Sequence, residues 1–134
     1  MLYFTISELL KSATAKENGY MEQFQPPDFV VDNLTLLVEN CLDKLRQTYG
    51  KSIHVNCGYR CERLNKKVGG VKTSEHLKGM AADITAGSPA ENKKLFDLAV
   101  SLNLPFRQLI DEQNYKWIHI SYNRDDVKRQ ILHL

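Results

Sequence analysis

Apolar positions recur at helical spacing in two segments near the start of the chain. Residues 7–17 carry apolar side chains three and four positions apart and end before Asn18-Gly19, which predicts a short amphipathic helix. Pro26-Pro27 then opens a longer apolar stripe that continues to Tyr49-Gly50. We expect this longer segment to form the main helix of the core.

A strand and a short helix are predicted next. Residues 52–56 alternate polar and β-branched side chains, which is typical of a short strand, and Gly58 follows as a turn. Residues 61–68 have the composition of about two helical turns. Gly69-Gly70 stops this helix, and we expect a flexible loop from there through Ser74.

The second half of the chain combines one more helix with a hairpin. Residues 88–91 supply an N-cap, a first-turn proline and a capping-box glutamate before an apolar run, which predicts a helix. Two strand-like runs follow at residues 106–110 and 116–122. The polar stretch between them, residues 111–115, predicts the turn of a hairpin.

This order of elements indicates an α+β fold in which a small antiparallel sheet packs against helices. A length of 134 residues is usual for one domain, so we expect a single domain over residues 1–134. Within it, the N-terminal helices would occupy residues 1–50. The core that carries the candidate chemistry would occupy residues 52–122.

Composition narrows the class of protein. The chain is 43% hydrophobic and 25% charged, which matches globular proteins rather than disordered or fibrous ones. A net charge of +2 gives no indication of a nucleic-acid partner. No apolar run approaches the roughly 20 residues that a membrane-spanning helix needs. We therefore expect no membrane insertion, and we expect a monomer.

The cysteines and the N-terminus bear on the compartment. The three cysteines, Cys41, Cys57 and Cys61, cannot all pair, so we expect reduced thiols. Cys41 lies on the apolar stripe of the long helix, where a buried inert thiol is expected. The N-terminal segment has no basic start and carries Glu8 within its apolar stretch. We therefore expect synthesis in a cytoplasm without a signal peptide.

Two histidines and an aspartate form a candidate metal site. His76 and Asp83 are separated by small residues that permit a turn, and strand alternation sends His119 to one face of its strand. Two nitrogens and one oxygen suit zinc, and three ligands leave a position for a water whose pKa zinc lowers to about 7. Spacing alone leaves an alternative open, in which these are a turn-capping histidine, a hydrogen-bond acceptor and a satisfied sheet histidine.

The residues around these ligands carry a family resemblance. The pattern Ser-x-His-x-x-Gly-x-Ala-x-Asp at residues 74–83, with Trp-Ile-His at residues 117–119, resembles the D-alanyl-D-alanine carboxypeptidase family. That family includes dipeptidases and phage endolysin peptidases and shares its fold with the hedgehog signalling domain. The resemblance extends from about residue 55 to residue 122. It implies a hedgehog/DD-peptidase-like fold and Zn²⁺ held by three residues, His76, Asp83 and His119.

A third segment, residues 57–60, is similar to the family's Ser/Thr-Gly-Tyr-Arg sequence. The resemblance implies that Arg60 faces the substrate, where a guanidinium can hold a carboxylate or stabilise an oxyanion. A structural ion pair is the alternative for Arg60. We also assign Tyr59 and Ser74 to substrate binding. Cys57 departs from the family's hydroxyl residue, which weakens any hydrogen bond that the hydroxyl makes, and no second metal site is expected from Cys57 and Cys61.

The general base is less obvious. In the better-known branches of the family an acid stands three residues before the second-motif histidine, and here that position is Lys116. The branch that this chain resembles most has an acid after a Gln-Leu-Ile run, which matches Glu112. We expect Glu112 to face His119 across the hairpin, with Asp111 on the opposite side. The alternative for Glu112 is a solvated turn carboxylate.

These observations predict a zinc-dependent peptidase that cleaves peptidoglycan stem peptides by metal-activated water. It would act as a D-Ala carboxypeptidase or as an endopeptidase of the endolysin type, and the substrate class follows from the resemblance alone. Without a signal peptide, the protein would reach the cell wall only after lysis or through a holin, and a cytoplasmic dipeptidase stays open. The alternatives are a non-catalytic zinc-containing binding module of the same fold and an accessory protein without metal.

Overall fold

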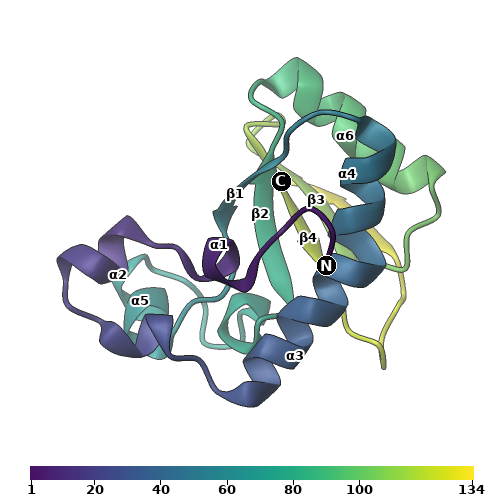
Figure 1. The fold of residues 1–134 in the computed structure, drawn as a ribbon. Coiled ribbons are helices and arrows are strands. Elements are labelled where there is room, and N and C mark those ends of the chain that lie inside the picture. The colour runs from purple at the N-terminus through teal and green to yellow at the C-terminus, as the bar shows by residue number, and fades with distance from the viewer.

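Helices occupy the first third of the chain, and a five-stranded sheet follows (Figure 1). The computed structural model describes residues 1–134. The helices are α1 (Ile6–Leu10), α2 (Ala13–Glu17), α3 (Asp28–Leu37), α4 (Asp43–Tyr49), α5 (Glu62–Lys67) and α6 (Pro89–Ser101). The strands are β1 (His54–Cys57), β2 (Ala81–Thr85), β3 (Gln108–Glu112), β4 (Trp117–Ser121) and β5 (Gln130–His133). None of the helices is long and apolar enough to span a membrane.

The predicted helix over residues 7–17 is wrong, because the segment forms two short helices. Thr5 and Glu8 make a capping box at the start of α1, and the Ser12 side chain caps α2 by accepting from the backbone N–H of Ala15. Lys11 has an extended backbone between them. A second N-cap inside the segment thus divides the amphipathic pattern.

The predicted long helix is present from α3 through α4. A π-helical segment, η2 (Val38–Leu42), joins the two parts, and Gly50 ends the helix in a left-handed conformation. Cys41 is fully buried on its apolar stripe, as expected, and burial raises the pKa of its thiol to about 12. The π-helical segment was not predicted, since the apolar spacing is compatible with an uninterrupted α-helix.

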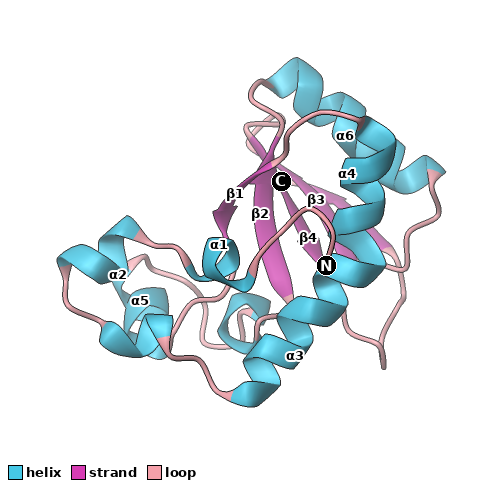
Figure 2. Ribbon diagram, in the orientation of Figure 1, coloured by secondary structure: helices cyan, strands magenta, loops and turns pink.

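The sheet has the strand order β1-β2-β4-β3-β5. Figure 2 labels the first four of these strands. Antiparallel pairing joins β1 to β2, β2 to β4 and β3 to β4, and the last pair is the predicted hairpin. The α+β prediction is therefore confirmed. The short strand β5 pairs in parallel with β3 and was not predicted. The first strand begins at His54, two residues later than expected.

Strand alternation separates an apolar face from a polar face. Ile84 of β2 and Ile118 and Ile120 of β4 are buried in one core with residues of the N-terminal helices. Asp83 and His119 point to the other face of the same strands. Figure 1 shows α2 and α5 near the β1 edge, away from α4 and α6. Residues 11–14, at the start of α2, and α5 line a pocket together with Asp83 of the polar face.

One buried amide ties the N-terminal helices to the loop after β1. Gln23 is fully buried, and its side-chain nitrogen donates to the carbonyls of Leu10 and Tyr59 at 2.9 and 2.8 Å. Its side-chain oxygen accepts from the backbone N–H of Cys61 at 2.8 Å. A buried amide with every partner in place fixes this loop relative to α1.

Replacing Gln23 by leucine should lower the free energy of unfolding by about 3 kcal/mol, because buried backbone groups lose their partners. Denaturant unfolding of the purified variant measures this. Exposed Gln25 is the matched control, and Gln25→Leu should change stability by less than about 0.5 kcal/mol. Equal stability of the two variants would contradict a structural role for the Gln23 amide.

Candidate metal centre

The predicted ligands Asp83 and His119 lie directly opposite each other on adjacent strands. Asp83 of β2 pairs with His119 of β4, and His119 Nδ1 lies 3.0 Å from Asp83 Oδ1. Cys57 pairs with Asp83 from β1, and Ile110 pairs with His119 from β3. The four residues form a row across the sheet, with Asp83 and His119 in the middle.

His76 reaches the same group from outside the sheet. It lies in the 3-10 helix η3 (Glu75–Lys78), where the Ser74 hydroxyl accepts from the His76 backbone N–H at 3.2 Å. His76 is only 2% exposed, and its Nδ1 lies 2.7 Å from the carbonyl of Gly58. A carbonyl can only accept, so Nδ1 carries the hydrogen. Nε2, 3.4 Å from Asp83 Oδ2, is then the nitrogen that can release its proton and bind a metal.

The two imidazoles therefore flank one carboxylate. Their ring centroids are 5.2 Å apart and their planes meet at 72°. The donor atoms of Cys57, His76 and Asp83 all lie within 4.8 Å of one another, and His119 joins this group through Asp83. The structure thus brings together the three predicted ligands and adds Cys57.

The charges of this group favour a cation. Burial acts to raise the pKa of Asp83, but hydrogen bonds with His119 and His76 hold it well below its ordinary value. Burial acts to lower the pKa of both histidines, but their hydrogen bonds with Asp83 raise it above the ordinary value. The carboxylate thus retains protons on both imidazoles, and a divalent cation can replace them.

Glu75 is a site residue that the sequence analysis missed. Its side chain is 16% exposed, and Oε1 lies 3.6 Å from His119 Nε2. Its other oxygen, Oε2, lies 3.3 Å from a guanidinium nitrogen of Arg107. A carboxylate facing Nε2 favours the tautomer with hydrogen there, which leaves the His119 Nδ1 lone pair on the Asp83 side. The only signal in the sequence is an acid beside a predicted ligand.

Glu112 lies on the polar face but not directly opposite His119, where we expected it. It pairs with Trp117 while Ile110 pairs with His119, so Glu112 stands diagonally to His119 on the same face. Burial raises the pKa of Glu112; the charge of His119 acts to lower this pKa, and the negative charges of Asp83 and Asp111 act to raise it. Glu112 is half-buried rather than a fully solvated turn residue.

Asp111 and Lys116, the nearby charged residues in the sequence, do not share the position of Glu112 on the polar face. Asp111 is buried on the opposite face, where it bonds to His133. Lys116 is exposed in the turn, and its backbone N–H donates to the carbonyl of Glu112 at 3.0 Å. Neither side chain is placed to replace Glu112 at the site.

Arg60 lines a pocket of about 420 Å³ beside the metal centre, together with Cys57, Asp83 and Lys11. One guanidinium nitrogen donates to the side chain of Asn65 at 3.0 Å, and the buried Nε has no partner. No carboxylate of the chain lies within ion-pair distance of Arg60. The guanidinium is therefore held in place with bonding capacity left for a ligand.

Tyr59 and Ser74, which were also assigned to substrate binding, are less accessible to a ligand than Arg60 or lie outside its pocket. Tyr59 lines the same pocket but is 8% exposed and belongs to the hydrophobic core. Ser74 does not line this pocket, and its hydroxyl caps the turn that carries His76. Its observed contact is therefore structural.

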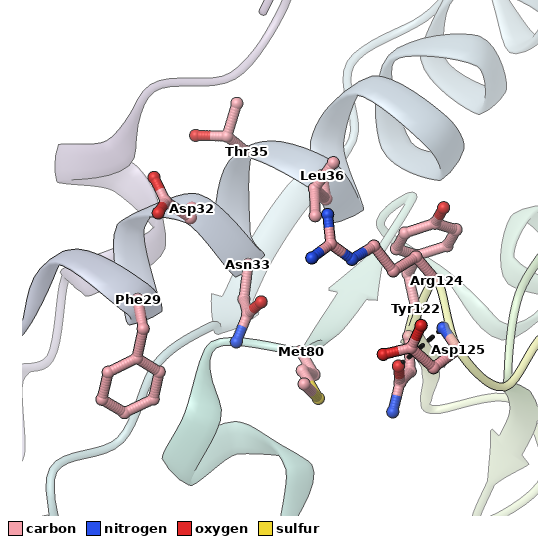
Figure 3. Close-up of a pocket in the computed structure, with 10 residues that line it drawn as sticks. Phe29, Asp32, Asn33, Thr35, Leu36, Met80, Tyr122, Arg124 and Asp125 are labelled. Carbon is pink, nitrogen blue, oxygen red and sulfur yellow. Dashed lines mark hydrogen bonds between the residues drawn. The ribbon is translucent and has the colours of Figure 1, made fainter.

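A separate hollow of about 530 Å³ lies between α3 and the segment after β4 (Figure 3). Phe29 and Asn33 line it from α3, and Met80, Tyr122 and Arg124 line it from the ends of the strands. None of the predicted site residues contributes to it. The candidate chemistry is confined to the smaller pocket and the adjacent metal centre.

Comparison with known proteins identifies a related family. A family model described as Peptidase M15 matches residues 2–121, which is nearly the whole chain. No curated protein matches the sequence. The matched region includes the N-terminal helices, which the motif-based resemblance left outside.

Replacing Glu75 by leucine should weaken zinc binding about 10- to 100-fold, because His119 loses the partner that sets its tautomer. Glu75→Gln should lose less, since its amide oxygen can still face the His119 Nε2–H. Competition with a chromophoric chelator measures the affinity, and the exposed Glu62→Gln variant is the control. Wild-type affinity in Glu75→Leu would show that Glu75 does not orient His119.

Proposed function

We propose that this chain, which belongs to the peptidase M15 family, is a zinc-dependent peptidase that cleaves peptidoglycan stem peptides. The family supports zinc peptidase activity in general, and the stem peptide is our proposal for the substrate. The observation that carries the proposal is the convergence of His76, Asp83 and His119 beside a pocket that holds a partly unpaired arginine. This arrangement combines a metal centre with a group that can bind a substrate anion.

The donor set fits zinc. Two imidazole nitrogens and one carboxylate oxygen are a combination found in catalytic zinc sites. His76, Asp83 and His119 would hold the ion. The Gly58 carbonyl orients the His76 ring, and the Glu75 carboxylate faces the His119 ring nitrogen that would not bind the ion. Zinc, when bound, supplies a Lewis acid that polarises the scissile carbonyl and activates water.

Glu112 is the proposed general base and acid. A carboxylate near the ion can take a proton from the attacking water and pass it to the leaving amine. The raised pKa of Glu112 suits both halves of this transfer, because a carboxyl with an ordinary pKa holds the proton only weakly. Asp111 faces away from the site, so it cannot take this role.

Arg60 is the proposed anchor for a carboxylate of the substrate. Its backbone N–H donates to the carbonyl of His76 at 3.0 Å, so the residue moves with the metal centre. Its side chain lines the pocket with Lys11, which adds a second positive charge. Two cations beside the metal favour a substrate with a carboxylate close to the scissile bond, as at the end of a stem peptide.

One observation favours a second candidate function. Cys57 lies with His76 and Asp83 in the donor group, and zinc sites with four protein ligands are typically structural. A non-catalytic zinc-containing binding module of the same fold is therefore the alternative. Turnover distinguishes the two, because a zinc-loaded protein that releases no amino groups from peptidoglycan or synthetic stem peptides would contradict the peptidase.

Glu112→Gln should lower kcat by about 10²- to 10⁴-fold while zinc content and zinc affinity stay unchanged, because the amide cannot carry the proton. Release of amino groups from synthetic stem peptides measures the rate, and elemental analysis measures the metal. Glu62→Gln, which changes an exposed glutamate, is the matched control. Full activity of Glu112→Gln would exclude Glu112 as the base.

Arg60→Ala should reduce kcat/KM about 10- to 100-fold for peptides with a free terminal carboxylate, because a charge-assisted hydrogen bond is lost. For the same peptides with an amidated terminus, kcat/KM of Arg60→Ala should differ little from that of the wild type. Mass spectrometry of the products measures both rates and identifies the bond that is cut. An equal loss on both substrates would contradict a carboxylate anchor.

A further inference from the structure

A β-bulge in β1 determines which residue faces Asp83. Val55 pairs with Ile84, but Cys57 rather than Asn56 pairs with Asp83, so β1 contains one extra residue. In a regular ladder Asn56 would lie opposite Asp83. The bulge therefore brings a thiol, in place of an amide, next to the metal centre.

The Cys57 sulfur lies beside the His76 ring and close to the Asp83 carboxylate. Its Sγ is 3.8 Å from Nδ1 of the His76 ring, and the donor atoms of Cys57, His76 and Asp83 lie within 4.8 Å of one another. Sulfur and nitrogen ligands on one tetrahedral zinc are about 3.5 Å apart, given their bond lengths. His76 would bind through Nε2, the other nitrogen of this ring, so the sulfur would have to shift from the Nδ1 side toward Asp83 to reach that spacing.

Only one of the three thiols is placed for this contact. Cys41 and Cys61 are buried in the hydrophobic core, at 0% and 3% exposure. Cys57 is half-buried and lines the pocket that also contains Asp83 and Arg60. A thiolate is a strong ligand for zinc. The Ser or Thr hydroxyl, which stands at this position in the family sequence that residues 57–60 resemble, is not a usual zinc ligand.

We propose that Cys57 is a fourth protein donor, so that in the absence of substrate the metal is held by Cys57, His76, Asp83 and His119. The thiol releases its proton to solvent as the sulfur binds. The sulfur then occupies the position that a water needs, and substrate entering the pocket would displace it. This effect on turnover rests on the proposed function, whereas the ligation itself does not.

The ligation has a spectroscopic test that needs no substrate. The wild-type protein, Cys57→Ser and Cys61→Ala are each loaded with one Co²⁺ per chain, and their near-ultraviolet spectra are compared. A thiolate-to-cobalt charge-transfer band should be present in the wild type and in Cys61→Ala and absent in Cys57→Ser. Equal spectra for the wild type and Cys57→Ser would overturn the proposal.

Alkylation of the unmodified chain is an independent measurement. Zinc should slow the reaction of Cys57 with iodoacetamide at least tenfold, with the site mapped by peptide mass spectrometry. Cys41 and Cys61 act as internal controls, because their burial in the core does not depend on the metal. The same alkylation rate at Cys57 with and without zinc would overturn the proposal even if the serine variant failed to fold.

Turnover separates this proposal from the proposed function. If Cys57 closes the site, Cys57→Ser should hydrolyse stem peptides several-fold faster than the wild type at equal zinc content. A charge-transfer band without turnover in either protein would support the ligation and contradict the peptidase. Turnover in both proteins without the band would support the peptidase and overturn the ligation.

Discussion

The contact between the Asp83 carboxylate and two imidazoles is the interaction on which the site depends. A carboxylate removed from water is stable only when it is paired and hydrogen-bonded. Asp83 meets this condition through His119 on the neighbouring strand and His76 on a separate turn. Sheet register fixes the first contact, and the Gly58 carbonyl fixes the second. The same arrangement that stabilises the charge places one nitrogen of each imidazole against it, where a divalent cation can replace the proton.

The N-terminal helices support this arrangement from a distance. The carbonyl of Leu9 approaches Gly58 so closely that a Cβ at Gly58 would lie 2.3 Å from its oxygen. The backbone N–H of Tyr59 donates to that carbonyl, and Gln23 bonds to the carbonyl of Tyr59. The loop that orients His76 is therefore packed against α1, which lies within the residues that the family model matches.

The sequence was most informative where local pattern and tertiary environment agree. The helix that begins at Pro89 follows from its cap, and alternation in β4 correctly places Ile118 inside and His119 on the polar face. The bulge before Cys57 and the orientation of Glu75 could not be predicted. Both depend on how one strand or turn meets another, and a single residue of register changes the face that a side chain takes.

The strand order also places a thiol and an acid on opposite sides of the Asp83–His119 pair. Cys57 approaches Asp83 from β1, and Glu112 approaches His119 from β3, so the two residues stand on opposite flanks of the Asp83–His119 pair. If a metal is held between these strands, a sulfur donor would reach it from the β1 side and a proton acceptor from the β3 side. The two roles proposed for Cys57 and Glu112 would then act from opposite sides of one carboxylate–imidazole pair, and sulfur binding would compete with the water that the base needs.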